Sequence, residues 1–262
     1  AGVRGLERQI AKICRKAVKE HALEKRFSVV VTSDLLEHFL GVRKFSYGLA
    51  EQQDQIGQVT GLAWTQVGGE ILEVEAGVVP GSGKVELTGN LGSVMKESAQ
   101  AVLSYIRSRA AQLGIEADFY KTKDIHVHFP EGAVPKDGPS AGIAITTAMV
   151  SALTGAPVRR EIAMTGEVTL RGRVLPIGGL KEKTMAAYRS GIKTVFLPAD
   201  NVPDLEEIDP TVRAALHFVP VEQVDSVLAE ALELKTCDPL RDDALPPPES
   251  GSRSREVPTF RQ

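Results

Sequence analysis

Strand and helix patterns are intermixed along residues 47–234, and this order constrains the fold more than any other feature of the chain. In GLAWTQVGGEILEVEAGVVPGSGKVELTG the pattern predicts strands on both sides of a turn at PGSG. Residues 91–114 predict one long helix that ends at Gly114. The segment IHVHFPEG alternates strictly, so a strand places one set of side chains on one face (Ile125, Val127, Phe129) and another on the opposite face (His126, His128).

The same mixture continues along the rest of this region. Two strands are predicted in EIAMTGEVTL and RVLPIGG, joined by a turn at Arg171 and Gly172. A helix over 180–191, a strand over 193–200, and a last strand and helix within 217–232 complete the pattern. Mixed strands and helices of this kind favour an α+β fold in which helices pack on mixed short sheets.

The two ends of the chain differ from this central part. Residues 2–23 predict an amphipathic helix with apolar positions at Leu6, Ile10, Ile13 and Ala17. Its basic face could simply be exposed to solvent, or it could contact an acidic partner or nucleic acid. Residues 28–41 predict a short strand and a short helix closed by Gly41, a connector that indicates a start inside a larger parent protein. Residues 235–262 lack apolar periodicity and predict a disordered tail.

Composition limits the function classes. The chain has 262 residues, 42% of them hydrophobic, and a formal net charge of -3, which gives no general attraction to nucleic acid or membranes. No stretch reaches the roughly 18 consecutive apolar residues of a membrane span, and the first residues lack the apolar core of a signal peptide. We therefore expect a cytoplasmic protein. Cys14 and Cys237 predict neither a disulfide framework nor a zinc site.

One serine stands out for its surroundings. In PKDGPSAG, Ser140 follows Pro139 and precedes small residues, directly before the apolar run IAITTAMVSALTG. This places Ser140 at the N-terminus of a helix, where backbone N–H groups and the helix dipole attract negative charge. Such a position suits an oxyanion hole, an anion site or a plain helix cap.

A serine nucleophile needs a base, and the chain offers a lysine. The GxSxG motif and the usual histidine triad spacing are missing. A lysine with a pKa of ~10.4 can accept a proton near neutral pH only if burial lowers that pKa by ~3 units. In GGLKEKTMAAYRSG a helix places Lys183 on the same face as small and apolar residues (Leu180, Thr184, Ala187, Gly191), while Lys181 points nearly opposite. Lys183 is therefore the better candidate base.

These motifs resemble a known family. PKDGPSAG and MTGEVTLRGRVLPIGGLKEKTMAA are similar to the proteolytic domain of the Lon family of ATP-dependent AAA+ serine proteases, and the similarity extends upstream through GLAWTQVGGE, LTGNLGSVMKESAQAV and HVHFPEGAVPKDG. The resemblance implies a Ser/Lys dyad of Ser140 and Lys183. It also implies an α+β fold shared with a ribosomal small-subunit protein and the GHMP kinases.

The resemblance also suggests roles for other residues. Thr165 matches the threonine that hydrogen-bonds the lysine. Asp137 matches a gating or orienting residue of the nucleophile loop, although a plain turn aspartate is the interpretation that the residue alone favours. His128 matches a residue that supports the dyad. His126 and His128 share a strand face and could ligate a metal, but no third ligand is near in the sequence, so we expect no metal site. Trp64, Gly138 and Pro139 match the substrate cleft, and the alternative for Trp64 is a place in the core.

The implied domains are the end of the AAA+ helical subdomain with a linker (1–44), the proteolytic domain (45–234) and the tail (235–262). The implied function is a serine endopeptidase for unfolded proteins or peptides, acting in a homohexameric ring without membrane or nucleic-acid partners. ATP and magnesium would belong to the AAA+ module, because the only GxxxxGK[ST] candidate here, ending at Gly83 and Lys84, lacks its first glycine and looks like a hairpin turn. A kinase-like nucleotide loop at PKDGPSAG and an inactive ring-forming module remain alternatives.

Overall fold

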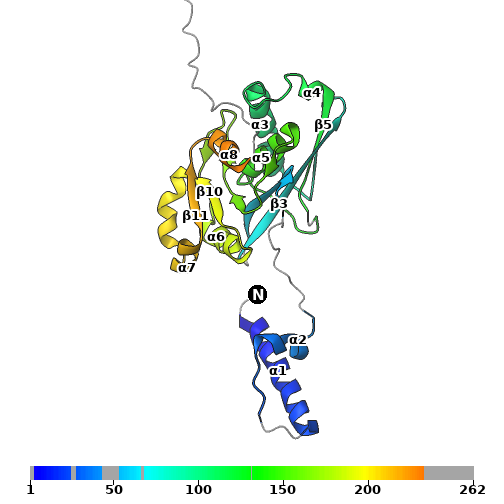
Figure 1. Ribbon diagram of the computed structural model, residues 1–262, viewed down its shortest axis with the longest axis vertical. Helices are drawn as coiled ribbons and strands as arrows, with labels where there is room; N and C mark the ends of the chain where they lie inside the picture. Colours follow the sequence, from blue (N-terminus) through cyan, green and yellow to red (C-terminus); the bar gives the residue numbers. More distant parts are fainter. Residues whose placement is uncertain (1–2, 25–27, 43–52, 66–67, 131, 233–262) are drawn as a thin grey trace, which may run out of the picture.

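The computed structural model describes residues 3–24, 28–42, 53–65, 68–130 and 132–232 (Figure 1). The strands are β1 (Gln55–Ile56), β2 (Gln58–Thr65), β3 (Gly68–Pro80), β4 (Val85–Thr88), β5 (Lys123–His128), β6 (Pro157–Val158), β7 (Ile162–Met164), β8 (Glu167–Val168), β9 (Val174–Leu175), β10 (Thr194–Pro198) and β11 (His217–Val221). The helices are α1 (Val3–Glu24), α2 (Leu36–Leu40), α3 (Ser93–Arg109), α4 (Phe119–Thr122), α5 (Gly142–Thr154), α6 (Leu180–Arg189), α7 (Pro210–Ala215) and α8 (Val224–Ala231). Two 3-10 helices, η1 (Ser33–Leu35) and η2 (Ala199–Glu207), complete the list.

The principal sheet is larger than the sequence indicated. It has seven strands in the order β11-β10-β7-β2-β3-β5-β4, whereas β1 with β6 and β8 with β9 form the short sheets that were expected. β11, β10, β7 and β2 are parallel neighbours, and β2 with β3 and β3 with β5 are antiparallel. The α+β class is confirmed, but a sheet built largely from strands distant in sequence cannot be read from local patterns.

Two strand predictions within residues 53–232 need correction. The turn at 81–84 does not form a hairpin, because β5 lies between β3 and β4 and pairs with both. EIAMTGEVTL is not one strand: β7 ends at Met164, and β8 begins at Glu167 in a different sheet. The break falls at Thr165 and Gly166. The turn predicted at Arg171 and Gly172 does join the antiparallel pair β8 and β9.

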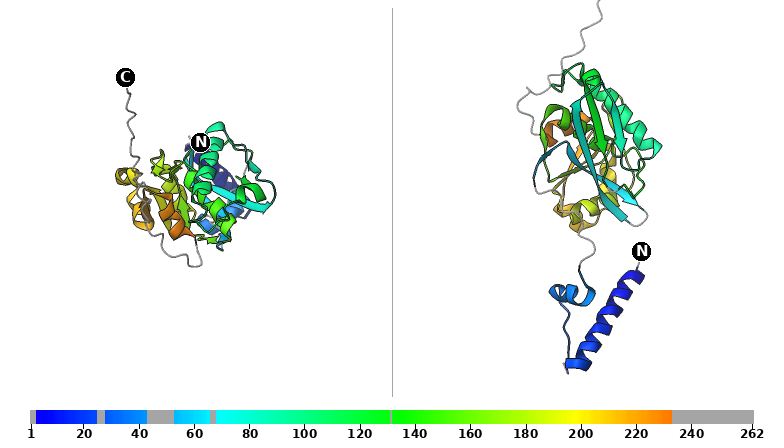
Figure 2. Two further views of the ribbon diagram at one scale, coloured as in Figure 1. Left: turned by 90° about the horizontal axis from the view of Figure 1, so that it is seen from above. Right: turned by 90° about the vertical axis from the view of Figure 1, so that its right-hand side faces the viewer.

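The sheet buries apolar side chains on both faces. One face packs against α3, α5 and α8 and holds the larger cluster, which includes Val59, Leu72 and Val74 from β2 and β3. The other face packs against α6 and α7 and holds a second cluster, which includes Leu62 of β2. Figures 1 and 2 show the sheet between these helices. Successive residues of a strand point to opposite faces of the sheet, so β2 contributes side chains to both clusters, and the central strands separate two cores.

The N-terminal helices pack on each other. α1 contacts α2, and two lysines of its basic face donate hydrogen bonds to the last carbonyls of α2: Lys12 Nζ to Leu40 O at 2.8 Å and Lys16 Nζ to His38 O at 3.1 Å. Cations at this end also complement the helix dipole. The predicted closure of α2 at Gly41 is confirmed by its φ of 89°. The strand predicted at the start of 28–41 is wrong, since these residues run directly into η1 without pairing.

Some predictions concern parts outside the described residues. The disordered tail, 235–262, and the domain boundary at 44–45 both fall there, so they stay predictions. Within the described ranges, no helix is both long enough and apolar enough to cross a membrane.

Candidate active site

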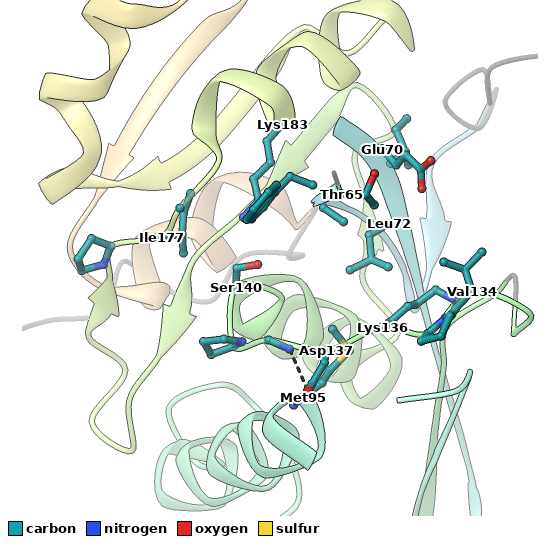
Figure 3. A pocket seen from close by; sticks show the side chains of 18 residues that line it. Thr65, Glu70, Leu72, Met95, Val134, Lys136, Asp137, Ser140, Ile177 and Lys183 are labelled. Carbon is teal, nitrogen blue, oxygen red and sulfur yellow. Dashed lines mark hydrogen bonds between the residues drawn. The ribbon is translucent and has the colours of Figure 1, made fainter. Parts of the chain in front are cut away.

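A cavity of about 310 Å³ opens between three segments (Figure 3). Its walls are the facing ends of β2 and β3, residues 134–140 before α5, and residues 176–178 before α6. Ser140 and Lys183 both line it. In Figure 3 Lys183 extends from α6 toward the turn that carries Ser140. The structure therefore brings together two residues that lie far apart in the sequence.

Ser140 sits in a tight turn that leads into α5. The turn is closed by a hydrogen bond from Gly142 N to Pro139 O at 3.0 Å, and Ser140 O accepts a hydrogen bond from Gly166 N at 2.8 Å. A side chain at Gly142 would begin only 2.7 Å from Val168 N, so the glycine allows the turn to rest directly on β8. Because α5 is buried along its first ten residues, the position of the turn is fixed by the core.

The amides at the start of α5 are less available than expected. Gly142 N is used within the turn, and Ile143 N donates to Gly166 O at 3.1 Å. An oxyanion or a phosphate at Ser140 would have to displace these bonds to use either group. The expectation that helix-end amides bind an anion is therefore not met at these two positions.

Lys183 faces the interior, as its helical position predicted. Its relative exposure is 1%, and Leu180, Thr184 and Ala187 on the same face are also buried. Lys181 is exposed, and Gly191 lies beyond the end of α6 and is exposed. Burial disfavours the charged ammonium form and lowers the pKa of Lys183 from its ordinary value of 10.5 to about 8.

Thr165 connects the two candidate residues. Its Oγ1 accepts a hydrogen bond from Lys183 Nζ at 3.0 Å and donates one to Ser140 O at 3.3 Å. Thr165 is fully buried at the point where β7 ends. Because β7 stops there, Ser140, which precedes α5, and Lys183, which lies on α6, can both hydrogen-bond Thr165. The hydrogen bond between the threonine and the lysine matches the pairing that the family resemblance implied.

Asp137 joins the loop that carries Ser140 to α3. Its Oδ1 accepts hydrogen bonds from Met95 N at 3.0 Å and from Gly138 N at 2.9 Å. Gly92 leaves room for this carboxylate, since a Cβ there would lie 2.2 Å from its carbon. The carboxylate thus acts as an external cap for a helix whose own N-cap residue has no side chain. Both earlier interpretations, a turn residue and an orienting residue, fit this geometry.

We expect Asp137→Ala to lower the free energy of unfolding by about 1 kcal/mol, because the N-terminus of α3 loses its cap. It should also slow chemical modification of Ser140, because the loop is no longer tied to α3. Urea unfolding and labelling by a fluorophosphonate measure the two effects. Asp209→Ala is the matched control, since Asp209 caps α7 through Thr211 N at 2.8 Å. If Asp209→Ala slowed labelling of Ser140 as much as Asp137→Ala does, the orienting role of Asp137 would be contradicted.

The predicted cleft residues line the cavity. Gly138 and Pro139 belong to its loop wall, and Trp64 to its strand wall. Trp64 is 54% exposed, so the alternative of a core tryptophan is wrong. Sequence reasoning missed Gly69, whose backbone touches α6. A glycine inside a strand pattern commonly marks such close backbone contact, and that signal was present in the sequence.

His128 lies apart from this cavity. It is not among the lining residues, and it is opposite Glu75 on β3, which at ~3.3 Å per residue is about 10 Å along the strand from Leu72 in the cavity wall. Thr88 Oγ1 forms hydrogen bonds with His128 Nδ1 at 2.7 Å and His126 Nε2 at 2.8 Å. Among the described residues, no group of three or more His, Cys, Asp or Glu could hold a metal ion.

The turn at Gly81–Lys84 does not fit a nucleotide phosphate. The amides of Ser82 and Lys84 both donate to Asp124 Oδ1, at 2.7 and 2.8 Å. A phosphate loop presents such N–H groups to a bound anion, but here they are already bonded to the protein's own carboxylate.

Comparisons with known proteins agree with these motifs. Residues 30–234 match the model of the Lon protease C-terminal proteolytic domain, and residues 1–29 match the Lon protease AAA+ ATPase lid domain. The chain is 63% identical to the Lon protease of Vibrio parahaemolyticus over 89% of its length, and 60% identical to that of Brevibacillus choshinensis over 88%. Identity to the Escherichia coli Lon protease is 59% over 89%. The chain spans 30% of each of these relatives. The chain therefore belongs to the Lon protease family and contains its C-terminal proteolytic domain, a serine peptidase domain.

Proposed function

We propose that Ser140 and Lys183 form a Ser/Lys dyad with which this domain hydrolyses peptide bonds as an endopeptidase. The observation that carries the proposal is the buried lysine in the cavity of Ser140, with its pKa lowered to about 8. Such a lysine holds a substantial neutral fraction near neutral pH, whereas an exposed lysine holds almost none. Thr165 supports the pair through its hydrogen bonds to both residues.

The reaction runs in two stages. Neutral Lys183 takes the proton of Ser140 as Oγ attacks the peptide carbonyl carbon, and it then gives that proton to the leaving amine as the C–N bond breaks. Water attacks the resulting ester while Lys183 accepts a proton from it, and Ser140 Oγ leaves with that proton. The amides of Ser140 and Ala141 are candidate donors to the oxyanion, because those of Gly142 and Ile143 are engaged.

The setting of this reaction is also a proposal. The domain would cleave unfolded proteins or peptides as part of an ATP-dependent protease that serves protein quality control in the cytoplasm. ATP and magnesium would be used by the AAA+ part, and the domain itself would need no cofactor or metal. We propose a homohexameric ring as its assembly, and neither membrane nor nucleic acid as its partner.

Ser140→Ala is expected to abolish hydrolysis of an unfolded protein without ATP, and also labelling by a fluorophosphonate, because the attacking oxygen is gone. Mass spectrometry locates the label, and gel analysis follows hydrolysis. Ser104→Ala is the matched control, since Ser104 is exposed on α3 and its hydroxyl donates a hydrogen bond to Gln100 O in the same helix.

Continued hydrolysis by Ser140→Ala would refute the proposal. If the unaltered chain is labelled at Ser140 but does not cleave protein, the nucleophile is identified and the defect lies in assembly or substrate access.

A further inference from the structure

Trp64 and Gly69 face each other directly across the β2–β3 pair. In an antiparallel pair, directly opposite residues project from the same face of the sheet. Here that face is the one covered by α6. The only tryptophan in the chain therefore stands beside a position with no side chain, and together they shape the surface on which α6 rests.

Gly69 permits backbone contact between β3 and α6. A Cβ placed on Gly69 would lie 1.9 Å from Glu182 O and 3.0 Å from Lys183 N. Any side chain larger than hydrogen must push β3 away from the peptide that joins these two residues. Gly69 does not have a positive φ, so what the position requires is space and not an unusual backbone conformation.

Trp64 contacts the other end of the same helical turn. A Cβ on Gly179 would lie 2.5 Å from Trp64 Cδ1, so the indole rests against the residue that precedes α6. Lys183 N donates to Gly179 O at 3.0 Å, which closes the first turn of the helix. The strand pair thus contacts this turn at both its beginning and its end.

We infer that Trp64 and Gly69 form a seat for the first turn of α6 that positions Lys183 and keeps its amino group out of water. They are positioning residues, and the inference rests on the proposed Ser/Lys dyad. Loss of either contact would let the turn lift from the sheet and admit water to the lysine. Among the described residues, Glu70, Lys136 and Asp137 are the other charged groups that line the cavity, and burial is the cause of the shifted lysine pKa.

The test is the pH dependence of Ser140 labelling by a fluorophosphonate in the full 262-residue chain. In Gly69→Ala we expect the midpoint to rise by about 1 pH unit, because a better hydrated lysine stays protonated longer. The labelling rate at pH 7 should fall about tenfold, since the neutral fraction falls tenfold per unit below the midpoint. Above both midpoints the rate should return to that of the unaltered chain, which general structural damage would not allow.

Gly77→Ala is the matched control. Gly77 lies on the same strand, and a Cβ there would have no heavy atom within 4 Å, so the midpoint should not move. An unchanged midpoint in Gly69→Ala overturns the inference.

If circular dichroism shows that Gly69→Ala does not fold, Trp64→Leu decides the question in the same assay. This variant removes the indole from Gly179, and we again expect a raised midpoint; an unchanged midpoint in a folded Trp64→Leu also overturns the inference. Failure of the dyad itself is distinguishable, because Ser140 of the unaltered chain would then show no lysine-dependent labelling at any pH.

Discussion

Replacing Lys183 by methionine is expected to lower peptide hydrolysis by about three orders of magnitude, as removal of a general base does. The same substitution should stabilise the fold at pH 7. Burial lowers the pKa of Lys183 from 10.5 to about 8, so holding its charged form in the interior below pH 8 costs about 3 kcal/mol. Loss of the hydrogen bond to Thr165 offsets about 1 kcal/mol of the gain.

The size of this stability effect depends on pH. Between about pH 8 and pH 10.5 the unfolded chain binds more protons than the folded one, so the stability of the unaltered protein rises with pH across this window. The advantage of Lys183→Met should therefore be largest below pH 8 and decrease above it. Urea unfolding at pH 7 and pH 10 measures both values. Lys181→Met, an exposed lysine on the same helix, is the control and should change neither activity nor stability appreciably.

The rate of peptide hydrolysis should follow the neutral fraction of Lys183. We expect kcat/KM for a short peptide to fall about fiftyfold from pH 8 to pH 6 and to level off above about pH 9, because the pKa of the lysine is about 8. Initial rates at low substrate concentration measure this profile. A midpoint near 10, or no midpoint at all, would contradict a buried lysine base. Lys181→Met again serves as control and should keep the midpoint.

The candidate dyad could be predicted because its signals are local. Ser140 lies in a loop with a recognisable motif, and the side of α6 that carries Lys183 follows from helical periodicity alone. Each of the two predictions therefore uses only residues that are close to Ser140 or to Lys183 in the sequence. The same holds for the alternation in β5, which correctly placed His126 and His128 on one face.

Features that depend on distant pairing could not be predicted. Nothing near PGSG indicates that β5 inserts between β3 and β4. The break at Thr165 reflects a change of sheet, and continuous β propensity through EIAMTGEVTL conceals it. The contact between Gly69 and Glu182 joins segments far apart in the chain. A glycine in a strand pattern indicates that another backbone segment packs closely there, but it does not identify that segment.

The division of the sheet into two cores also has a consequence for the order in which the proposed dyad is completed during synthesis. Ser140 belongs to a turn on the α5 core, whereas Lys183 sits on α6, whose apolar face packs into a cluster that continues as far as Leu216. Synthesis from the N-terminus makes Ser140 first and Lys183 later, and the residues that complete the two cores, up to Leu216 in one and Leu232 in the other, later still. We therefore expect a growing chain to carry the serine without a buried lysine beside it until α8 has been made. On the proposed dyad, protease activity should begin only when nearly the whole domain has been made.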